Sequence, residues 1–215
     1  MLEEMSAFFN SRAERYNVVH VEHIDGGMES KNIIASFLPD HTQTIIDFGI
    51  GTGLELAEIY NRFPDVEITG LDIAENMLNL LRETYPDKNI RLHCESYLNF
   101  DFGNCRYDIA MSVMTLHHYN HKTKTDLYRK IYDCIKPNGI YIECDYIIPD
   151  QELEDFYFAE YERLKDEQGI NDDREYHYDT PCTAVNQLKM LSDAGLKNVR
   201  EVWQNNNTVI IIAEK

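Results

Sequence analysis

Short apolar segments rich in β-branched residues alternate with segments of helical periodicity along most of the chain. Residues 44–48 and 67–71 are segments of the first kind, and residues 54–63 between them carry apolar side chains at helical spacing. This alternation predicts an α/β fold with a mainly parallel sheet and helices on both faces. The predicted strands are 44–48, 67–71, 90–93, 107–114, 139–144, 199–204 and 208–213, and the predicted helices include 54–63, 75–85 and 122–135.

The last two predicted strands are joined by only three residues, Asn205, Asn206 and Asn207. A parallel pair would need a crossover of a dozen or more residues. Asparagine also tolerates the left-handed backbone that tight turns require. We therefore expect an antiparallel hairpin at the end of the chain. The overall prediction is a Rossmann-like, doubly wound, seven-stranded sheet, parallel except for its last strand.

The length of 215 residues suits a single domain, residues 1–215. Two segments lie outside the alternating pattern. Residues 1–38 are predicted to form an N-terminal helical cap, and residues 149–181 a helical insert whose aromatic stripe includes Tyr157 and Tyr161. Because the insert follows the fifth strand, it should lie over the carboxyl ends of the sheet, where ligands of open α/β folds bind. We interpret it as a lid over the substrate, with an ordinary core helix as the alternative.

The formal net charge is −18, with 20 basic and 38 acidic residues. Nucleic-acid binding depends on Lys and Arg to neutralise phosphates, and this chain has no basic run. The same argument counts against an anionic membrane surface. No apolar run reaches the length of about 20 residues that spans a membrane. The expected partner is a small molecule, and the expected assembly is a monomer or a homodimer.

Five cysteines are scattered along the chain and form no C-x-x-C pair. This spacing favours reduced thiols over a disulfide framework. The first residues include acids where a secretory signal would have Lys or Arg. Both observations predict a cytoplasmic protein.

Three glycines, Gly49, Gly51 and Gly53, follow the first predicted strand, and Asp72 ends the second. Glycines allow a sharp turn and the close approach of a ligand. An acid at the end of the next strand can accept hydrogen bonds from ribose hydroxyls. The third glycine of G-x-G-x-x-G is missing, because Leu54 or Leu56 stands in its place. No Gly-Lys-Ser/Thr follows the turn either. The dinucleotide-binding and P-loop motifs are therefore excluded, and a nucleoside-binding site is the remaining interpretation.

The D-x-G-x-G-x-G run from Asp47 to Gly53 resembles the first motif of the class I S-adenosylmethionine-dependent methyltransferases. The resemblance implies S-adenosylmethionine (SAM) as cofactor and S-adenosylhomocysteine as product. It also implies that the glycine turn, with Thr52, receives the methionine part of the cofactor, and that Asp72 holds the ribose. Asp47 can order the turn or meet the ammonium group. The alternative is a glycine-rich turn followed by a surface acid.

Further cofactor contacts follow from position. Ile73 and Met77 can sandwich the adenine, and the resemblance implies a polar adenine contact from Glu95, Ser96 or Tyr97. A polar loop start is the alternative for these three residues. The resemblance also implies that Ser112 and Met114 line the methionine end. Phe9, Arg12 and Tyr16 resemble the entry helix of small members of the family, which implies that Tyr16 touches the methionine moiety; packing on the core is the alternative.

His117 and His118 follow the fourth predicted strand, and Asp145 ends the fifth. Leu-His-His at this point is frequent in the family that the chain resembles. Imidazole near its ordinary pKa can take a proton from a hydroxyl or amine. Either histidine could be the base and Asp145 its orienting partner, or a histidine could satisfy a loop carbonyl. No cysteine or carboxylate stands beside the histidines at ligand spacing, so no metal site is predicted.

The second half of the chain is similar in order to the carboxy-S-adenosylmethionine synthases. The similarity covers residues 136–139, the aromatic insert, residues 194–196 and residues 203–207. It implies an arginine in the insert that binds the added carboxylate. Arg174 is the arginine that the resemblance assigns to this role, and Tyr176 near it is a further candidate for the substrate site.

The predicted function is SAM-dependent in-line methyl transfer to the oxygen or nitrogen of a small molecule. One alternative is a carboxy-S-adenosylmethionine synthase-like enzyme. Another is a module that binds SAM without turnover. A nicotinamide oxidoreductase is disfavoured by the missing glycine.

Overall fold

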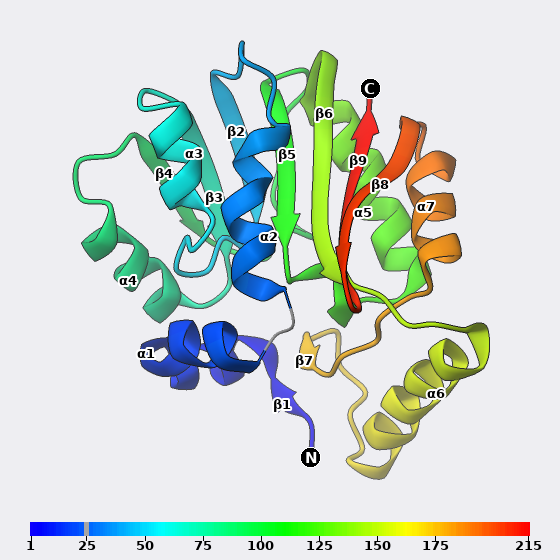
Figure 1. Cartoon of the computed structure of the whole chain (residues 1–215). Helices are drawn as coiled ribbons and strands as arrows, with labels where there is room; N and C mark the ends of the chain where they lie inside the picture. The colour runs from blue at the N-terminus through cyan, green and yellow to red at the C-terminus, as the bar shows by residue number, and fades with distance from the viewer. Residues whose placement is uncertain (24–25) are drawn as a thin grey trace.

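A seven-stranded sheet forms the centre of the protein (Figure 1). This computed structural model describes residues 1–23 and 26–215, and side chains for 1–17 and 26–215. β9 pairs antiparallel with both of its neighbours, β6 and β8, so it is the one reversed strand of the sheet. The predicted Rossmann-like sheet with an antiparallel last strand is confirmed. The strand order is β4 (Ile90–Cys94), β3 (Glu67–Asp72), β2 (Thr44–Phe48), β5 (Tyr107–Val113), β6 (Ile135–Tyr146), β9 (Thr208–Glu214) and β8 (Lys197–Asn205).

Helices cover both faces of the sheet because its central strands are apolar on both sides. Adjacent residues Ile45 and Ile46 of β2, for example, enter two different buried clusters. One face carries α2 (Gly27–Ile34), α3 (Leu56–Arg62) and α4 (Glu75–Thr84), and the other carries α5 (His121–Cys134) and α7 (Ala184–Asp193). These layers leave the ends of the strands free for other elements.

The elements outside the layers gather at the carboxyl ends of the parallel strands (Figure 1). They are α1 (Met5–His23), α6 (Gln151–Glu167) and the short antiparallel pair of β1 (Glu3–Glu4) with β7 (Tyr176–His177). The backbone N–H of Met5 also donates to the Glu175 carbonyl at 2.9 Å. The start of the chain is therefore tied to the segment that follows α6, across the end of the sheet.

The predicted N-terminal cap, residues 1–38, divides into two parts. α1 lies across the strand ends, but α2 and the 3₁₀ turn η1 (Ala35–Phe37) belong to the helical layer on the sheet face. Ile34 and Leu38 are buried in the same cluster as Ile45, which explains the difference. The boundary of the cap therefore lies near the end of α1.

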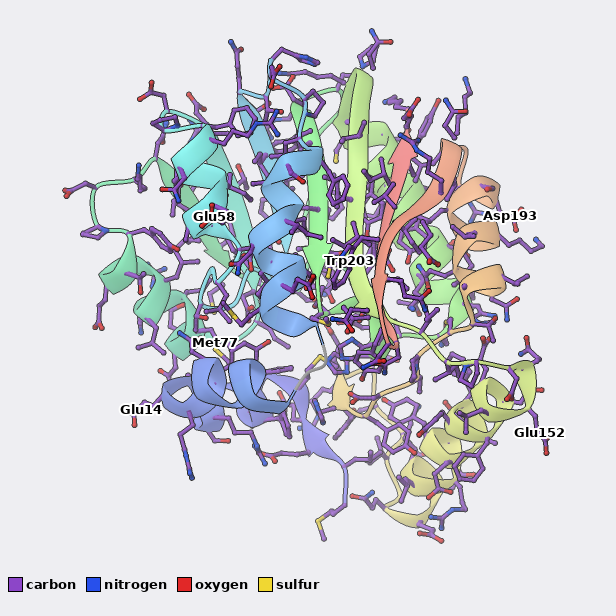
Figure 2. The ribbon with its side chains drawn as sticks, in the orientation of Figure 1. Glu14, Glu58, Met77, Glu152, Asp193 and Trp203 are labelled. Atoms are coloured by element: carbon purple, nitrogen blue, oxygen red, sulfur yellow. The ribbon has the colours of Figure 1, made fainter. Side chains whose placement is uncertain are left out.

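Side chains mark the inner and outer sides of these elements. Figure 2 shows Glu14 on α1, Glu152 on α6 and Asp193 on α7 directed outward. Met77 of α4 lies where α4 meets α1, and it is buried with Ala13 of α1. The contact between α1 and α4 thus closes one side of the space at the strand ends.

The order of the strands reverses at β2. The chain runs from β2 outward through β3 to β4 and then returns to β5 on the other side of β2. Ligands of open α/β sheets bind at such a switch point, at the carboxyl ends of the strands. Within the described residues no helix is both long and apolar enough to cross a membrane.

Candidate cofactor and acceptor site

The glycine turn and Asp72 meet in a small cavity of about 40 Å³ at the end of β2, which Gly49, Gly51 and Asp72 line together. The Asp72 carboxylate accepts hydrogen bonds from the backbone N–H of Gly51 at 2.9 Å and of Ala74 at 2.8 Å. The acid at the end of β3 therefore fixes the conformation of the turn after β2.

Burial raises the pKa of Asp72 to about 6, although the backbone N–H groups of Ala74 and Gly51 work in the opposite direction. At neutral pH the carboxyl is therefore ionised. Burial also raises the pKa of Tyr16, and the charge of Asp72 adds to this effect. Tyr16 and Phe9, both on α1, also line the cavity.

The remaining walls of this cofactor cavity are mainly apolar. Ile73, Met77 and Met114 are among the residues that line it. Met114 has a left-handed backbone, with φ of 53°, which is uncommon for a residue other than glycine. Such conformations gather at functional sites.

The structure separates the three candidates after β4. Tyr97 lines the cofactor cavity, and its hydroxyl lies 3.0 Å from the Thr115 hydroxyl. Glu95 is exposed. The Ser96 hydroxyl accepts a hydrogen bond from the backbone N–H of Leu98 at 3.3 Å. Only Tyr97 of the three reaches the cavity wall.

Thr52 and Gly53 support the turn from outside the cavity. The Thr52 hydroxyl donates to Asn17 Oδ1 at 2.6 Å, which links the turn to α1. A Cβ added at Gly53 would lie 2.9 Å from Leu56. Gly53 therefore allows close packing of α3 rather than lining the cavity.

The expectation that Ser112 lines the methionine end is corrected by the structure. Its buried hydroxyl lies 2.7 Å from the Tyr141 hydroxyl, inside a network that also contains Glu143 and Tyr128. Successive strand residues face opposite sides of a sheet, and Ser112 faces the core beneath α5. Burial raises the pKa of Glu143 in this network to about 7.

A buried charge cluster lies close to the cofactor cavity. Asp47 and Glu55 are buried acids, and Lys31 of α2 is a buried base near Glu55. Neither oxygen of Asp47 has a hydrogen-bond donor among the described residues. Burial and the charge of Glu55 raise the pKa of Asp47 well above its ordinary value. An acid without a donor at this position fits a cationic ligand group such as an ammonium.

Replacing Asp47 with Asn is expected to stabilise the ligand-free chain at pH 8. A carboxyl whose folded-state pKa is raised contributes stability below its unfolded pKa, and this contribution is lost as pH rises through the folded pKa. The near-isosteric amide has no charge to bury. We expect a gain of about 1 kcal/mol, or about 2–4 °C in Tm, with little change at pH 4. Thermal unfolding at both pH values checks this, and an equal Tm shift at both would refute it.

A second cavity of about 610 Å³ adjoins the first. The two share Phe9, Tyr16, Met114 and His118 as walls, so they are neighbouring parts of one site. A volume between about 300 and 1,000 Å³ is typical of small-molecule sites. We call this space the acceptor cavity; its further walls are Phe8, Arg12, Arg15, His117, Tyr146, His177 and Asp179.

His117 and Asp145 form a buried pair at the floor of the acceptor cavity. The His117 Nδ1 atom lies 2.6 Å from Asp145 Oδ1. The other oxygen of Asp145 accepts from the backbone N–H of Leu116 and of His117, each at 3.0 Å. Burial opposes charge on His117, but the Asp145 carboxylate outweighs it and raises the histidine pKa. With Nδ1 held by Asp145, Nε2 is left for a ligand.

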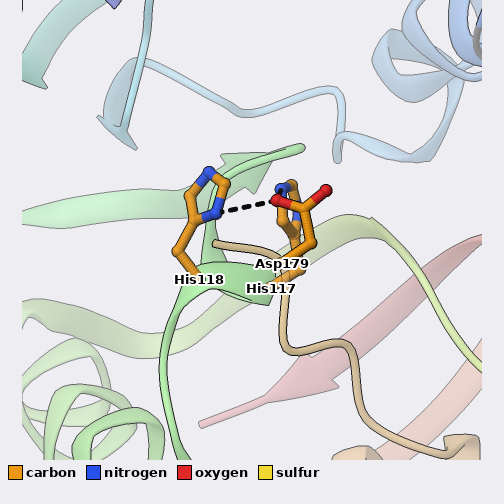
Figure 3. A group of neighbouring side chains, drawn as sticks. All are labelled: His117, His118 and Asp179. Carbon is orange, nitrogen blue, oxygen red and sulfur yellow. Dashed lines mark ion pairs between the residues drawn. The ribbon is translucent and has the colours of Figure 1, made fainter. Parts of the chain in front are cut away.

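His118 and Asp179 form the next part of the wall (Figure 3). The His118 Nδ1 atom lies 3.2 Å from Asp179 Oδ1. Both histidines belong to the 3₁₀ turn η2 (Leu116–His118), whereas Asp179 lies on the loop between β7 and α7. Burial and the neighbouring His117 lower the pKa of His118, so it is neutral at neutral pH.

The predicted lid residues do not face this cavity as a group. Tyr161, Arg174 and Tyr176 line a third cavity of about 380 Å³, which shares Met5, His118 and Tyr119 with the cofactor cavity. Arg174 is exposed, and it pairs with Asp172 at 2.7 Å and Glu4 at 3.0 Å. Tyr157 packs edge-on against Phe156 of the same helix. Local acids hold the Arg174 guanidinium in this structure, and its assignment to the substrate site stays a prediction.

Several site residues escaped the sequence analysis. Lys31 and Glu55 gave no signal because their proximity to Asp47 depends on tertiary packing. Asp179 and His177 stand in a short run, residues 176–179, that is rich in aromatic and polar side chains. That run was a possible signal for a functional loop.

Comparison with known proteins agrees with the fold and the cofactor cavity. A family described as a methyltransferase domain matches residues 45–139. Carboxy-S-adenosyl-L-methionine synthase of Nautilia profundicola is 25% identical over 99% of this chain and 93% of its own length. Phosphoethanolamine N-methyltransferase of Plasmodium falciparum is 26% identical over 78% of this chain and 64% of its own length.

Among solved structures, human N-acetylserotonin methyltransferase in complex with SAM superposes with a TM-score of 0.70 at 17% identity. The match covers 99% of this chain but only 59% of the human protein. It shows the shared Rossmann-like fold.

These matches, the glycine turn and the sheet order define an enzyme of the SAM-dependent transferase class. Residues 45–139 carry a class I S-adenosylmethionine-dependent methyltransferase domain, whose cofactor is SAM.

Proposed function

We propose that this protein is a cytoplasmic enzyme that transfers the SAM methyl group to an oxygen or nitrogen of a small molecule. The observation that carries the proposal is the Asp145–His117 pair at the floor of a 610 Å³ cavity beside the cofactor cavity. The pair is buried, its Nδ1 is committed, and its Nε2 is left to act on an acceptor. SAM supplies an electrophilic methyl group when bound.

The residues around the cofactor cavity fit SAM. Asp72 accepts ribose hydroxyls, and Ile73 and Met77 flank the adenine. Asp47, with its two oxygens lacking donors, suits the ammonium group. Tyr16 and Phe9 cover the site from α1 and exclude water, which strengthens electrostatic interactions inside.

The acceptor cavity favours a small acceptor that is neutral or negatively charged. Its walls carry three histidines and two arginines against a single aspartate, although the chain as a whole has a net charge of −18. The aromatic rings of Phe8, Phe9 and Tyr146 provide apolar contacts for the rest of the molecule. A nucleic-acid acceptor is disfavoured by the net charge.

Two roles are open to His117 Nε2. It can accept the proton of the acceptor directly, or it can bind an ion that holds the acceptor. Asp145 supports both roles, because a carboxylate on the far nitrogen fixes the tautomer and raises the basicity of the ring.

A carboxy-S-adenosylmethionine synthase-like activity is the second candidate. It is favoured by the 25% identity with that enzyme over nearly the whole chain. It is disfavoured by Arg174, which the resemblance assigns to the added carboxylate but which pairs with Asp172 and Glu4 outside both cavities. A module that binds SAM without turnover is the third candidate.

Three measurements separate these candidates. The full-length protein is incubated with SAM and a library of small hydroxyl and amine acceptors, and S-adenosylhomocysteine release is measured. Release with one or a few acceptors supports the methyltransferase. Mass spectrometry of the ligand retained through purification identifies a carboxylated cofactor, which would instead support the second candidate. Tight SAM binding with no product from any acceptor would support the third.

Exchange of Asp72 for Ala is expected to weaken SAM binding by about 10- to 100-fold. Hydrogen bonds to a charged group are worth about 1.5–3 kcal/mol, and the variant removes the acceptor for the ribose. It also removes the bond that holds the Gly51 N–H. Calorimetric titration measures the change. Unchanged affinity in a folded variant would refute the role assigned to Asp72. Exchange of Glu58 for Ala serves as the control, because Glu58 is a half-buried residue of α3 that does not line the cofactor cavity.

A further inference from the structure

We propose that His117, His118 and Asp179 bind one divalent transition-metal ion in the acceptor cavity. His117 Nε2 lies 3.7 Å from Asp179 Oδ1, and His118 Nδ1 lies 3.2 Å from the same oxygen (Figure 3). The three donor atoms all lie within 4.8 Å of one another. Ligand atoms at the corners of a tetrahedron with Zn–N and Zn–O bonds of about 2.0–2.1 Å are about 3.3 Å apart, so the spacing already approximates a metal site.

The loop that carries Asp179 is fixed against the histidine turn. The backbone N–H of Thr180 donates to the His117 carbonyl at 2.6 Å, and the Thr180 hydroxyl donates to the same carbonyl at 3.1 Å. An isolated bridge between Ile148 and Thr183 holds the far side of the loop. Asp179 is therefore placed by backbone contacts and not by its pairing with histidine.

Asp179 Oδ1 is a buried atom, and its partly exposed carboxylate interacts with His118 and with the Tyr146 hydroxyl, so a bound ion would compete with these two groups. Both nearby imidazole nitrogens lie within reach of it, and His118 Nδ1 also lies 3.3 Å from the Tyr178 carbonyl, a contact that a bound ion would replace. His117 presents Nε2 because Nδ1 is held by Asp145 at 2.6 Å. A carboxylate on the far nitrogen of a metal-binding histidine is a common arrangement, and it fixes the tautomer that binds the metal. The site thus has its three possible ligands, and Asp145 holds one of them, His117, in position.

The donor set indicates which ions fit. Two imidazoles and one carboxylate leave a coordination position for a further ligand, which is typical of catalytic Zn²⁺ and of non-haem Fe²⁺ sites. His177 Nε2 lies 3.8 Å from Asp179 Oδ1 and borders the same space. Since the acceptor cavity surrounds the open position, a small acceptor with an oxygen or nitrogen donor can occupy it.

The inference deepens the proposed function. An acceptor hydroxyl bound to the ion loses its proton to water more readily, since a metal ion lowers the pKa of a bound O–H group. His117 then acts as a ligand, and the ion holds the acceptor beside Met114 and the cofactor cavity. The binding of metal itself does not depend on the methyl-transfer proposal.

A second cluster consists of His121, Glu154 and Cys182, whose possible ligand atoms also lie within 4.8 Å of one another. Its Cys182 sulfur lies 3.5 Å from the Lys124 ammonium, and His121 lies 2.5 Å from Glu154. The internal cation disfavours a metal ion there, so this cluster provides a matched control. Cys182→Ser removes its thiol with little change in shape.

The test is a Zn²⁺ titration of the chelator-stripped, full-length protein by calorimetry. We expect one ion per chain, and at least 100-fold weaker binding in His118→Gln and in Asp179→Asn. Asp145→Asn, which changes the support behind His117, should weaken binding by about 10- to 100-fold. Cys182→Ser should bind as the wild type does. Zinc binding within threefold of wild type in both ligand variants, or its loss in Cys182→Ser alone, would overturn the proposal.

Two further readouts keep the test decisive. Co²⁺ added to the wild type should give the visible absorption of a tetrahedral site with nitrogen ligands, and its absence would count against the site even if the variants misfold. SAM titration of the same samples separates the two proposals. A protein that binds SAM but no metal overturns only the metal site, and one that binds metal but no SAM overturns only the assigned cofactor cavity.

Discussion

Exchange of His117 for Ala is expected to lower the methyl-transfer rate by about 10²- to 10⁴-fold while SAM affinity changes less than threefold. A side chain positioned to accept the proton of the acceptor typically raises the rate by about 10²- to 10⁴-fold. If His117 instead binds a metal ion, its loss would remove the activation of the acceptor by that ion. His117 lines the acceptor cavity but not the cofactor cavity, so binding of the cofactor should survive. The measurement is kcat with an acceptor identified by S-adenosylhomocysteine release, beside a SAM titration of the same variant.

The control is His41→Ala, because His41 is exposed in the loop that precedes β2, at the other end of the sheet. It should retain wild-type turnover. If the wild-type rate falls after chelation and returns with added Zn²⁺, His117 acts through a bound ion. If the rate does not change, His117 accepts the proton directly. Wild-type kcat in a folded His117→Ala protein would contradict both roles.

A pair of glycine substitutions separates folding from cofactor binding. Gly49 and Gly51 both have positive φ, at 72° and 53°. A Cβ on Gly49 would lie 2.3 Å from Thr115 Oγ1 and 2.8 Å from its Cβ, whereas a Cβ on Gly51 would approach only the Gly49 carbonyl, at 3.9 Å. Gly49→Ala therefore crowds the protein itself, and Gly51→Ala mainly crowds the cavity that Gly51 lines.

We expect Gly49→Ala to lose about 2–4 kcal/mol of stability, from overpacking and left-handed strain together. This corresponds to a fall in Tm of about 5–15 °C for a domain of this size. Gly51→Ala should cost only the strain, about 1–2 kcal/mol, yet weaken SAM binding at least tenfold. Thermal unfolding and SAM titration of both variants make the comparison.

Gly169 provides the matched control. Its φ is 64°, and a Cβ there would have nothing within 4 Å. Gly169→Ala should therefore show the cost of strain alone and bind SAM as the wild type does. If Gly51→Ala binds SAM as tightly as Gly169→Ala, the cofactor does not approach the turn as proposed.

The sheet could be predicted because its signals are local. Each strand of the sheet was recognised from a short apolar run, and the three-residue link of asparagines required the antiparallel hairpin. The turn from Gly49 to Gly53 and Asp72 were also readable, since parallel strand ends meet at one edge of a sheet. β6 begins earlier than predicted, at Ile135, because a bulged run that includes Pro137 continues its pairing with β5.

The side to which a residue points was harder to predict. Ser112 was expected at the cavity, but a strand alternates its side chains at every residue. Neighbouring residues of β5 therefore face opposite sides of the sheet, and the Ser112 hydroxyl faces Tyr141 in the core. Arg174 shows the same limit in a loop, because its partners Asp172 and Glu4 are set by the pairing of β1 with β7.

Clusters made from distant segments could not be predicted from spacing. No carboxylate stands beside His117 and His118 in the sequence at the spacing of metal ligands. Asp179 follows the histidines by more than sixty residues in the sequence. It lies beside them because Thr180 donates hydrogen bonds to the His117 carbonyl. Lys31 and Asp47 both lie near Glu55 for the same reason, since α2 packs against α3, which follows Glu55.

The central claim is that SAM binds between the glycine turn, Asp72 and α1. Calorimetric titration of the full-length protein with SAM tests it most directly. One site per chain is expected, with affinity that rises with pH around the Asp72 pKa of about 6, because the ionised carboxylate favours the cationic cofactor. No heat of binding with millimolar SAM at pH 8, from protein shown to be folded, would contradict the account.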